Sequence, residues 1–413
     1  MASFMKIVFG YTGGLEATVA LAWLRETFQA EIIAVCADLG QGDELRGLEK
    51  RATKAGAAKV LIEDLQEEFA RDFVFPLTQA GAIRGDQYFL GTSIATSLVV
   101  KRMVEIARQH QVSHLAHAAT GKGNDQVRFE LTAAALAPEL PVIALWRDGS
   151  FRAQFPRRAE MIRFCEERKI PLPASAKHLF TINRNILQAS FASGGLDDPW
   201  SDSSAPEHKD LFKLSVAPEE APDKAEQITL EFEKGVCVAV NGRPMSPLAV
   251  LRALNRHGGK HGIGRIDLVE NREADTKSRG VYETPAGAIL QFGHLQLESL
   301  TLDRDARRLQ DSLIPKYSEL VHQGNWFSPE REALQSVVTE LQKKVTGTIR
   351  LKLYKGSISN AGRKSPQSLF TARTDAAASD STPSYNQAES TELVRLNSLR
   401  LKVASHLENA KQE

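Results

Sequence analysis

The sequence predicts an α/β protein with a doubly wound parallel sheet in its N-terminal part, followed by an α+β domain and a C-terminal helix. Up to about residue 146, short apolar runs alternate with longer amphipathic ones, which is typical of parallel strands joined by helices. Beyond about residue 170, strand-like runs follow one another with period-two alternation, as in a mixed α+β domain. We therefore predict three segments, 1–170, 171–371 and 372–413.

The strands of the first segment are predicted from short runs rich in branched apolar residues. Such runs are typical of strands that are buried on both faces. They are Ile7–Gly10, Ile32–Val35, Val60–Ile62 and Val142–Leu145, with a further strand expected near Ser113–Ala118. Between them, Leu21, Leu24 and Phe28 recur at helical spacing, and a second helical face runs from Leu98 to Ile106.

The later segments show different patterns. Ile228–Glu233 alternates and is followed, after Lys234-Gly235, by Val236–Val240, which predicts a hairpin. Thr348–Tyr354 alternates again and predicts another strand. Residues 372–390 are small and polar and predict a linker. The apolar stripe after this linker predicts a helix that packs on a neighbouring subunit; it consists of Leu393, Leu396, Leu399 and Val403.

Composition excludes some classes of partner. The chain has 52 basic and 51 acidic residues, so no global field would attract a nucleic acid or an anionic membrane. No apolar run approaches the roughly 20 residues that span a bilayer, and no leader pattern precedes the first strand, so we expect a cytoplasmic protein. Cys36, Cys165 and Cys237 are widely spaced, which favours buried free thiols over disulfides or a zinc site.

A glycine pair at the end of the first predicted strand is a candidate phosphate loop. Thr12-Gly13-Gly14 follows Tyr11 directly and precedes a helical pattern, which is the geometry of an anion site at a helix N-terminus. The hydroxyls of Thr12 and Thr18 and the free N–H groups of the first helical turn are suited to phosphate oxygens. Ordinary turn chemistry is the alternative interpretation of a Gly-Gly pair. The chain contains no Walker-type Gly-x-x-x-x-Gly-Lys-[Ser/Thr] pattern.

A second candidate loop, Thr120-Gly121-Lys122-Gly123-Asn124-Asp125-Gln126-Val127-Arg128-Phe129-Glu130, follows the strand expected near residue 118. Its glycines and its crowded polar side chains suit recognition of a charged small molecule. The alternative is a glycine-rich connection whose charges are simply solvated.

These two loops carry a resemblance to the argininosuccinate synthase family that extends from Lys6 to about Lys402. The family's Ser-Gly-Gly-Leu-Asp-Thr-Ser loop stands here as Thr-Gly-Gly-Leu-Glu-Ala-Thr at 12–18. Further matching blocks are residues 37–41, 72–76, 90–93, 264–267, 269–272, 277–285 and 397–402.

The resemblance implies an N-type ATP pyrophosphatase domain, related to the adenine nucleotide alpha hydrolases, within a homotetramer. It also implies a ligase of arginine biosynthesis and the urea cycle that joins citrulline to aspartate with ATP, through a citrullyl-adenylate. The cofactors would be ATP and Mg²⁺, with the ion carried by ATP and near Glu16 rather than held in a protein site of its own.

Carried over residue by residue, the resemblance implies that Thr12, Glu16 and Lys122 are catalytic. The remaining ATP contacts would be Gly10, Tyr11, Gly13, Gly14, Leu15, Ala17, Thr18, Ala37, Ala118 and Gly121. Aspartate would contact Thr120, Asn124 and Asp125. Citrulline would contact Tyr88, Ser93, Asn124, Arg128, Thr181, Ser190, Glu270 and Tyr282.

Several positions depart from the family pattern. Ala118 replaces a glycine, Ala95-Thr96-Ser97 replaces Ala-Arg-Pro, and residues 181–185 lose two carboxylates and gain Arg184. With the variant loop at 12–18, these departures concern nucleotide binding and site closure more than the amino-acid substrates. Three hypotheses therefore stand: an active synthase, a paralog that adenylates another ureido or amide substrate, and a catalytically silent member that binds amino acids.

Overall fold

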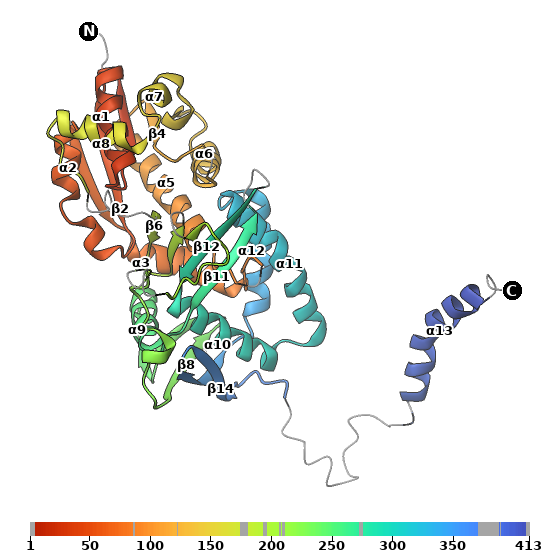
Figure 1. Cartoon of the computed structure of the whole chain (residues 1–413). Coiled ribbons are helices and arrows are strands. Elements are labelled where there is room, and N and C mark those ends of the chain that lie inside the picture. The colour runs from red at the N-terminus through yellow and green to blue at the C-terminus, as the bar shows by residue number, and fades with distance from the viewer. Residues whose placement is uncertain are drawn as a thin grey trace. The chain divides into compact units, whose positions relative to one another are not determined.

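The computed structural model describes residues 5–85, 87–121, 123–173, 181–192, 196–205, 208, 211–271, 276–370, 388 and 390–409 (Figure 1). The chain divides into two compact units, Met1–Ser368 and Leu369–Glu413. Each unit is described by itself.

The first unit begins with a five-stranded parallel sheet in the order β3-β2-β1-β4-β5. Its strands are β1 (Lys6–Gly10), β2 (Glu31–Asp38), β3 (Lys59–Asp64), β4 (His114–His117) and β5 (Val142–Ala144). The chain builds outward from β1 to β3 and then returns to add β4 on the other side of β1. The strand order therefore reverses between β1 and β4, and loops that leave these two strands diverge from neighbouring ends.

Helices cover both faces of this sheet. They are α1 (Leu15–Phe28), α2 (Leu48–Lys54), α5 (Gly91–Gln109), α6 (Asp125–Leu136), α7 (Gly149–Gln154) and α8 (Arg158–Glu167). Ile7 and Phe9 of β1 are buried in a cluster with residues of α1, α7 and α8, whereas Val8 is buried with residues of α5 and α6. This alternation within one strand confirms the predicted doubly wound arrangement.

The prediction that all the apolar runs form buried strands is wrong for the two outer strands. Ile62 of β3 keeps 44% of its surface exposed, and β5 is only half-buried along its length. Both strands lie at the edges of the sheet, where a strand has one neighbour and incomplete helical cover. Leu145, predicted as strand, begins the 3₁₀ turn η3 (Leu145–Arg147).

Two antiparallel sheets make up the later part of the first unit. One has the order β10-β9-β8-β13-β14, with β8 (Glu226–Glu233), β9 (Val236–Val240), β10 (Arg243–Pro244), β13 (Gly347–Tyr354) and β14 (Ser357–Lys364). The other has the order β11-β12-β7-β6, with β6 (Thr181–Arg184), β7 (Ala189–Ala192), β11 (Arg265–Asn271) and β12 (Lys277–Glu283). The predicted hairpin at 228–240 and the predicted strand at 348–354 are confirmed.

The remaining helical segments connect the two parts of this unit. They are η1 (Gly42–Leu45), α3 (Gln66–Glu68), the π-helical turn η2 (Phe69–Val74), α4 (Phe75–Gln79), η7 (Pro218–Glu220), α9 (Pro247–Lys260), α10 (Pro285–Thr301), α11 (Arg304–Gln323) and α12 (Pro329–Gln342). One hydrophobic cluster runs from η2 and α5 into α10 and α11, and in it the rings of Phe73 and Trp326 stack at 4.8 Å between centroids. This continuous packing fixes α5 against α11, which matters for the site.

The second unit contains α13 (Ser390–Asn409), which confirms the predicted C-terminal helix. Its apolar stripe is exposed, with Leu396 at 72%, and none of its residues is buried. Nearly all of the predicted linker 372–390 lies outside the described residues. Packing of this helix on a neighbouring subunit stays a prediction.

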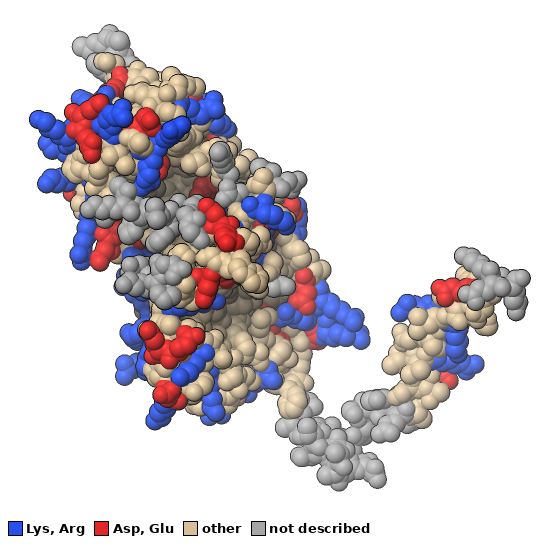
Figure 2. All heavy atoms as spheres, viewed as in Figure 1, with Lys and Arg blue, Asp and Glu red and all other residues tan. Residues whose placement is uncertain are grey.

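The distribution of surface charge and the state of the three cysteines agree with what the composition indicates. On the face drawn in Figure 2, basic and acidic side chains are interspersed over the first unit rather than gathered by sign. Cys36, Cys165 and Cys237 are buried free thiols. Within the described part of the chain, no helix is both long enough and apolar enough to cross a membrane.

Candidate functional site

The two candidate loops predicted from the sequence lie where the strand order of the parallel sheet reverses. Phe9 of β1 pairs with Ala116 of β4, so the loop after Gly10 and the loop after His117 leave the sheet side by side. The predicted residue Ala37 lies near the end of β2, on the other side of β1. Ligands in open α/β sheets bind at such a reversal, outside the carboxyl ends of the strands.

The loop after β1 has the geometry of an anion site. Gly13 has φ = +77°, a conformation that L side chains rarely adopt, and a Cβ there would lie 3.2 Å from Nη2 of Arg51. Gly14 is the N-cap of α1 and supplies no side-chain acceptor, so the first-turn N–H groups are not capped by it. Thr12 is exposed, and its Oγ1 accepts a 3.4 Å hydrogen bond from the Gly14 N–H.

Thr18 lies beneath this loop, against the expectation that its hydroxyl faces a phosphate. Its side chain is fully buried and its Oγ1 donates to the carbonyl of Gly14 at 2.7 Å. Because that bond uses its single proton, the Tyr11 hydroxyl, 2.9 Å away, donates to Thr18. Burial raises the pKa of Tyr11, which keeps this donor protonated. The pair supports the turn from the interior of the protein.

Glu16, the residue expected near Mg²⁺, is paired with a cation. Its Oε1 lies 3.2 Å from Nη1 of Arg158, at the start of α8, and both side chains are a little over two-fifths exposed. An exposed pair of this kind contributes at most about 1 kcal/mol to stability. Its main effect is electrostatic: the carboxylate of this longer side chain already has a counterion beside the phosphate loop.

The loop after β4 presents the second set of predicted residues. Thr120 and Gly121 are exposed, and Asn124 precedes the first residue of α6. The methyl group of Ala118 packs against the cluster formed by β1, β2 and α1. Lys122, predicted to be catalytic, lies outside the described residues.

Arg128 projects from the first turns of α6 and is 4% exposed. Its Nη1 donates to Oδ1 of Asp125 at 2.8 Å, and its Nε donates to the carbonyl of His322 at 2.7 Å. The guanidinium is therefore held from two sides, as a rigid fork for a carboxylate requires.

The predicted citrulline residues from the antiparallel part meet the same cluster. Tyr282 donates to Oε1 of Glu270 at 2.7 Å, and its ring lies 5.1 Å from that of Tyr88. In the sheet, Ser190 of β7 pairs with Tyr282 of β12. Ser93 is fully buried in the first turn of α5, and the side chain of Thr181 lies outside the described residues.

The buried tyrosines and charges of this cluster influence one another. Burial raises the pKa of Tyr88, with Arg128 acting to lower it and Glu270 to raise it. Burial also raises the pKa of Tyr282, and the charges of Tyr88 and Glu270 add to that effect. Both phenols are therefore neutral hydrogen-bonding groups at working pH, which suits binding more than proton transfer.

Comparison with known proteins assigns the family. A family model described as the arginosuccinate synthase N-terminal HUP domain matches residues 6–171, and the model of the arginosuccinate synthase C-terminal domain matches residues 180–404. The argininosuccinate synthase of Oleidesulfovibrio alaskensis is 49% identical over 397 residues, 96% of this chain and 97% of that protein. That of Syntrophus aciditrophicus is 48% identical over 97% of this chain and 98% of that protein.

The chain belongs to the argininosuccinate synthase family. This membership confirms the family and the fold predicted from the sequence. The argininosuccinate synthase of Nitratiruptor, 46% identical over 98% of both chains, agrees with it.

Two departures from the family pattern have structural explanations. Arg184 of β6 donates to the carbonyl of Gln41 and lies 3.4 Å from Oε1 of Glu44, so it ties the antiparallel part to the loop after β2. Thr96 donates to the carbonyl of Thr92 within its own helix. Arg184 therefore connects two parts of this family member, whereas the hydroxyl of Thr96 makes its hydrogen bond within α5.

Two neighbours of the predicted site residues, Arg84 and His322, were not expected from the sequence. His322, at the end of α11, contacts Asn124 and Arg128, and Arg84 contacts His322. No spacing pattern indicates them, because 238 residues separate the two side chains. Only the packing of α11 against α5 and α6 brings His322 to the site.

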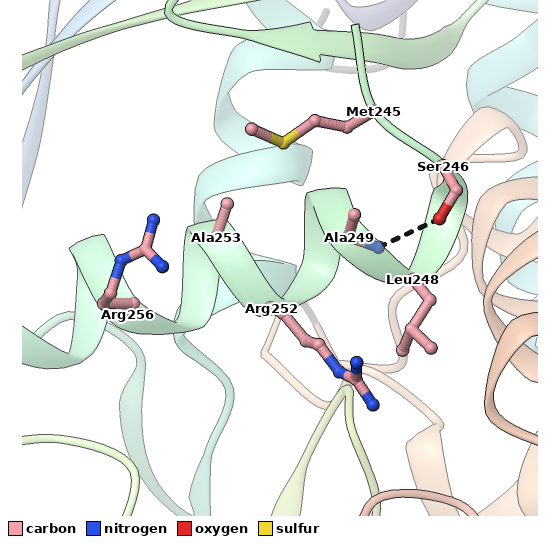
Figure 3. A pocket seen from close by; sticks show the side chains of 7 residues that line it. All are labelled: Met245, Ser246, Leu248, Ala249, Arg252, Ala253 and Arg256. Carbon is pink, nitrogen blue, oxygen red and sulfur yellow. Dashed lines mark hydrogen bonds between the residues drawn. The ribbon is translucent and has the colours of Figure 1, made fainter. Parts of the chain in front are cut away.

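A surface hollow of about 340 Å³ lies elsewhere, along α9, and contains none of the predicted residues (Figure 3). Ser246 caps the helix there by accepting from the Ala249 N–H, and Glu67 accepts from the N–H of Leu248. The helix N-terminus beside this hollow is thus already occupied by protein groups.

Proposed function

We propose that this chain catalyses the ATP-dependent joining of citrulline and aspartate to argininosuccinate, with release of AMP and pyrophosphate, as a step of arginine biosynthesis. One observation carries the proposal. The glycine loop after β1 and the polar loop after β4 leave paired strands, and Arg128 of α6, which follows the second loop, interacts electrostatically with Tyr88 and Glu270. Family membership supports the choice of substrates.

The reaction has two steps. The ureido oxygen of citrulline attacks the α-phosphorus of ATP, and pyrophosphate leaves. The amine of aspartate then attacks the ureido carbon of the adenylate, AMP leaves, and the amine gives up a proton. Little covalent chemistry is required of the protein, so alignment and charge stabilisation supply the rate enhancement.

The chain's own groups divide these tasks. The N–H groups at the start of α1, the Thr12 hydroxyl and Lys122 stabilise the leaving pyrophosphate. Mg²⁺ would neutralise phosphate charge and prefers oxygen ligands, so the half-exposed carboxylate of Glu16 beside the loop would suit it as an outer partner. Ala37 and Ala118 lie where the rest of the nucleotide would pack.

At the amino-acid end, Arg128 and Glu270 suit the carboxylate and ammonium groups of citrulline, with Tyr88 and Tyr282 around its side chain. Ser93, Ser190 and Thr181 supply hydroxyls. Thr120, Asn124 and Asp125 hold aspartate with its amine toward the adenylate. Homotetramer assembly through α13 and a cytoplasmic location complete the proposal and rest on the family.

The test is a product assay with purified protein, ATP and Mg²⁺. Pyrophosphate should be released when citrulline is present, and argininosuccinate should form only when aspartate is added as well. Pyrophosphate release with another ureido or amide compound, but not with citrulline, would replace this proposal with the paralog hypothesis. Absence of turnover together with a thermal shift by citrulline would replace it with the silent amino-acid-binding hypothesis.

A further inference from the structure

Arg84 and His322 form a cluster at the edge of the amino-acid site that none of the carried-over roles includes. Arg84 begins the turn that ends at Tyr88, and the two residues exchange backbone hydrogen bonds of 3.0 Å each. Its side chain is half-buried. His322 is 1% exposed, and its ring lies 6.3 Å from that of Tyr88.

The imidazole of His322 is a neutral acceptor in this cluster. Its Nε2 accepts from Nη1 of Arg84 and lies 3.4 Å from Nδ2 of Asn124. A guanidinium only donates, so Nε2 carries a lone pair and the ring proton is on Nδ1. Burial, then Arg128 and then Arg84, lowers the pKa of His322 to about 3, which agrees with this geometry.

The charge of Arg84 is consequently unmatched within the part of the chain that the structure describes. No described carboxylate lies within 4 Å of its guanidinium, whereas Arg128 has Asp125 at 2.8 Å. A carboxylate in place of His322 would fix Arg84 and also neutralise it. A neutral imidazole fixes the guanidinium and leaves its positive charge for another anion.

We propose that Arg84 is a further substrate-binding residue, which receives a carboxylate of an amino-acid substrate beside Asn124, and that His322 is the positioning residue that aims it. The inference rests on the proposed function and deepens it. The carboxylate comes from one of two sources, the α-carboxylate of citrulline or a carboxylate of aspartate. Asn124 is assigned to both substrates, so kinetics must distinguish the two sources.

The first test compares Arg84→Gln with wild type and with Arg71→Gln, a matched control at an exposed arginine paired with Asp72. Loss of a charge-assisted contact should raise KM for one amino acid about 10- to 100-fold, with KM for ATP and kcat within about threefold of wild type. The substrate whose KM rises is the source of the carboxylate. Unchanged KM values for both amino acids in a folded variant would overturn the proposal.

The second test distinguishes a role of His322 in positioning Arg84 from a general structural role. His322→Ala should raise KM for the same amino acid, His322→Gln should restore much of the loss through its amide oxygen, and His322→Ala should add little in an Arg84→Gln background. Fully additive effects would show that His322 acts independently of Arg84. Melting temperatures of all variants identify any that fail to fold.

Failure of the proposed function gives a distinct result. If wild type does not turn over citrulline and aspartate, direct titration of each amino acid into wild type and Arg84→Gln replaces the kinetics. If one amino acid binds wild type more tightly than it binds Arg84→Gln, the result supports this inference even though the proposed function has failed. Equal affinities, or no binding to either protein, overturn it as well.

Discussion

The loop expected to hold the phosphates of ATP is contiguous in the sequence and partly exposed, whereas the residues expected to hold the amino acids come from distant segments and are mostly buried. Thr12 and Glu16 lie within one strand-to-helix turn and make few side-chain contacts with the rest of the protein. Arg128, Tyr88 and Tyr282 are each less than 7% exposed and lie in a group connected by hydrogen bonds and ring contacts.

This difference indicates what a sequence change at each end of the site would cost. A change at an exposed turn alters the chemistry of the site and costs the fold little. A change in a buried polar cluster leaves a partner unsatisfied and destabilises the protein as well as the site. The variant residue Glu16 lies at the first kind of position and the retained Arg128 at the second, whereas the variant residues Ala17 and Thr18 of the same loop are buried.

The largest effect should come from Arg128→Ala, which tests the buried end. It removes the donor to the His322 carbonyl and to Asp125, and should cost about 2–4 kcal/mol of unfolding free energy. It should also lower kcat/KM for citrulline by on the order of a thousandfold. Denaturant unfolding and steady-state kinetics measure the two effects. A loss of activity with unchanged stability would contradict the claim that changes at the buried end destabilise the protein as well as the site.

Gly13→Ala should weaken ATP binding without changing citrulline binding, and so distinguish the two ends of the site. The φ of +77° strains any L side chain, and the new methyl would press on Leu48 and Arg51, so we expect a cost of about 1–2 kcal/mol. KM for ATP should rise about tenfold while citrulline affinity is unchanged. Gly14→Ala is the matched stability control, because Gly14 has φ = −71° and its nearest neighbour would be 3.5 Å away. Equal melting temperatures for the two variants would contradict the strain argument.

The double variant Glu16→Asp, Ala118→Gly tests whether the departures from the family pattern at the exposed end limit turnover. Shortening the side chain moves the carboxylate by about 1 Å and loosens its 3.2 Å pair with Arg158. Turnover should rise, by up to about tenfold, with stability nearly unchanged. The readout is pyrophosphate release at saturating substrates. An unchanged rate would mean that the variant loop does not limit turnover.

The smallest effect is expected far from both ends, at Glu226. Burial raises the pKa of this carboxyl, but hydrogen bonds from Lys260, His257 and His261 outweigh it and lower the pKa to about 2. A folded-state pKa below the unfolded value of about 4.3 stabilises the fold above that value, and this stability is lost as pH falls toward 2.

Glu226→Gln should therefore melt a few degrees below wild type at pH 6–7, and the difference should shrink from about pH 4.5 downward. Thermal unfolding at a series of pH values measures it, and turnover at pH 7 should be unchanged. A melting-temperature difference that grows as the pH falls would contradict a lowered pKa of Glu226 in the folded protein.

Much of the fold followed from local patterns. Period-two alternation predicted β8, β9 and β13, and helical spacing predicted α1, α5 and α13, because these periodicities report which side of an element faces apolar neighbours. The same reasoning failed for Val60–Ile62, since an apolar run does not reveal whether its strand lies at the centre or the edge of a sheet. The family was also predictable, because its motifs are short and contiguous.

The sequence by itself determined the geometry of the candidate phosphate loop, because a strand, two glycines and a helix N-terminus follow one another in consecutive residues. Only the tertiary structure decided that Thr18 is buried beneath this loop, that Glu16 meets Arg158, and that His322 contacts Arg84. These contacts depend on how helices pack across a sheet or between domains. Residues that lie far apart in the chain share no periodicity from which such a meeting can be inferred.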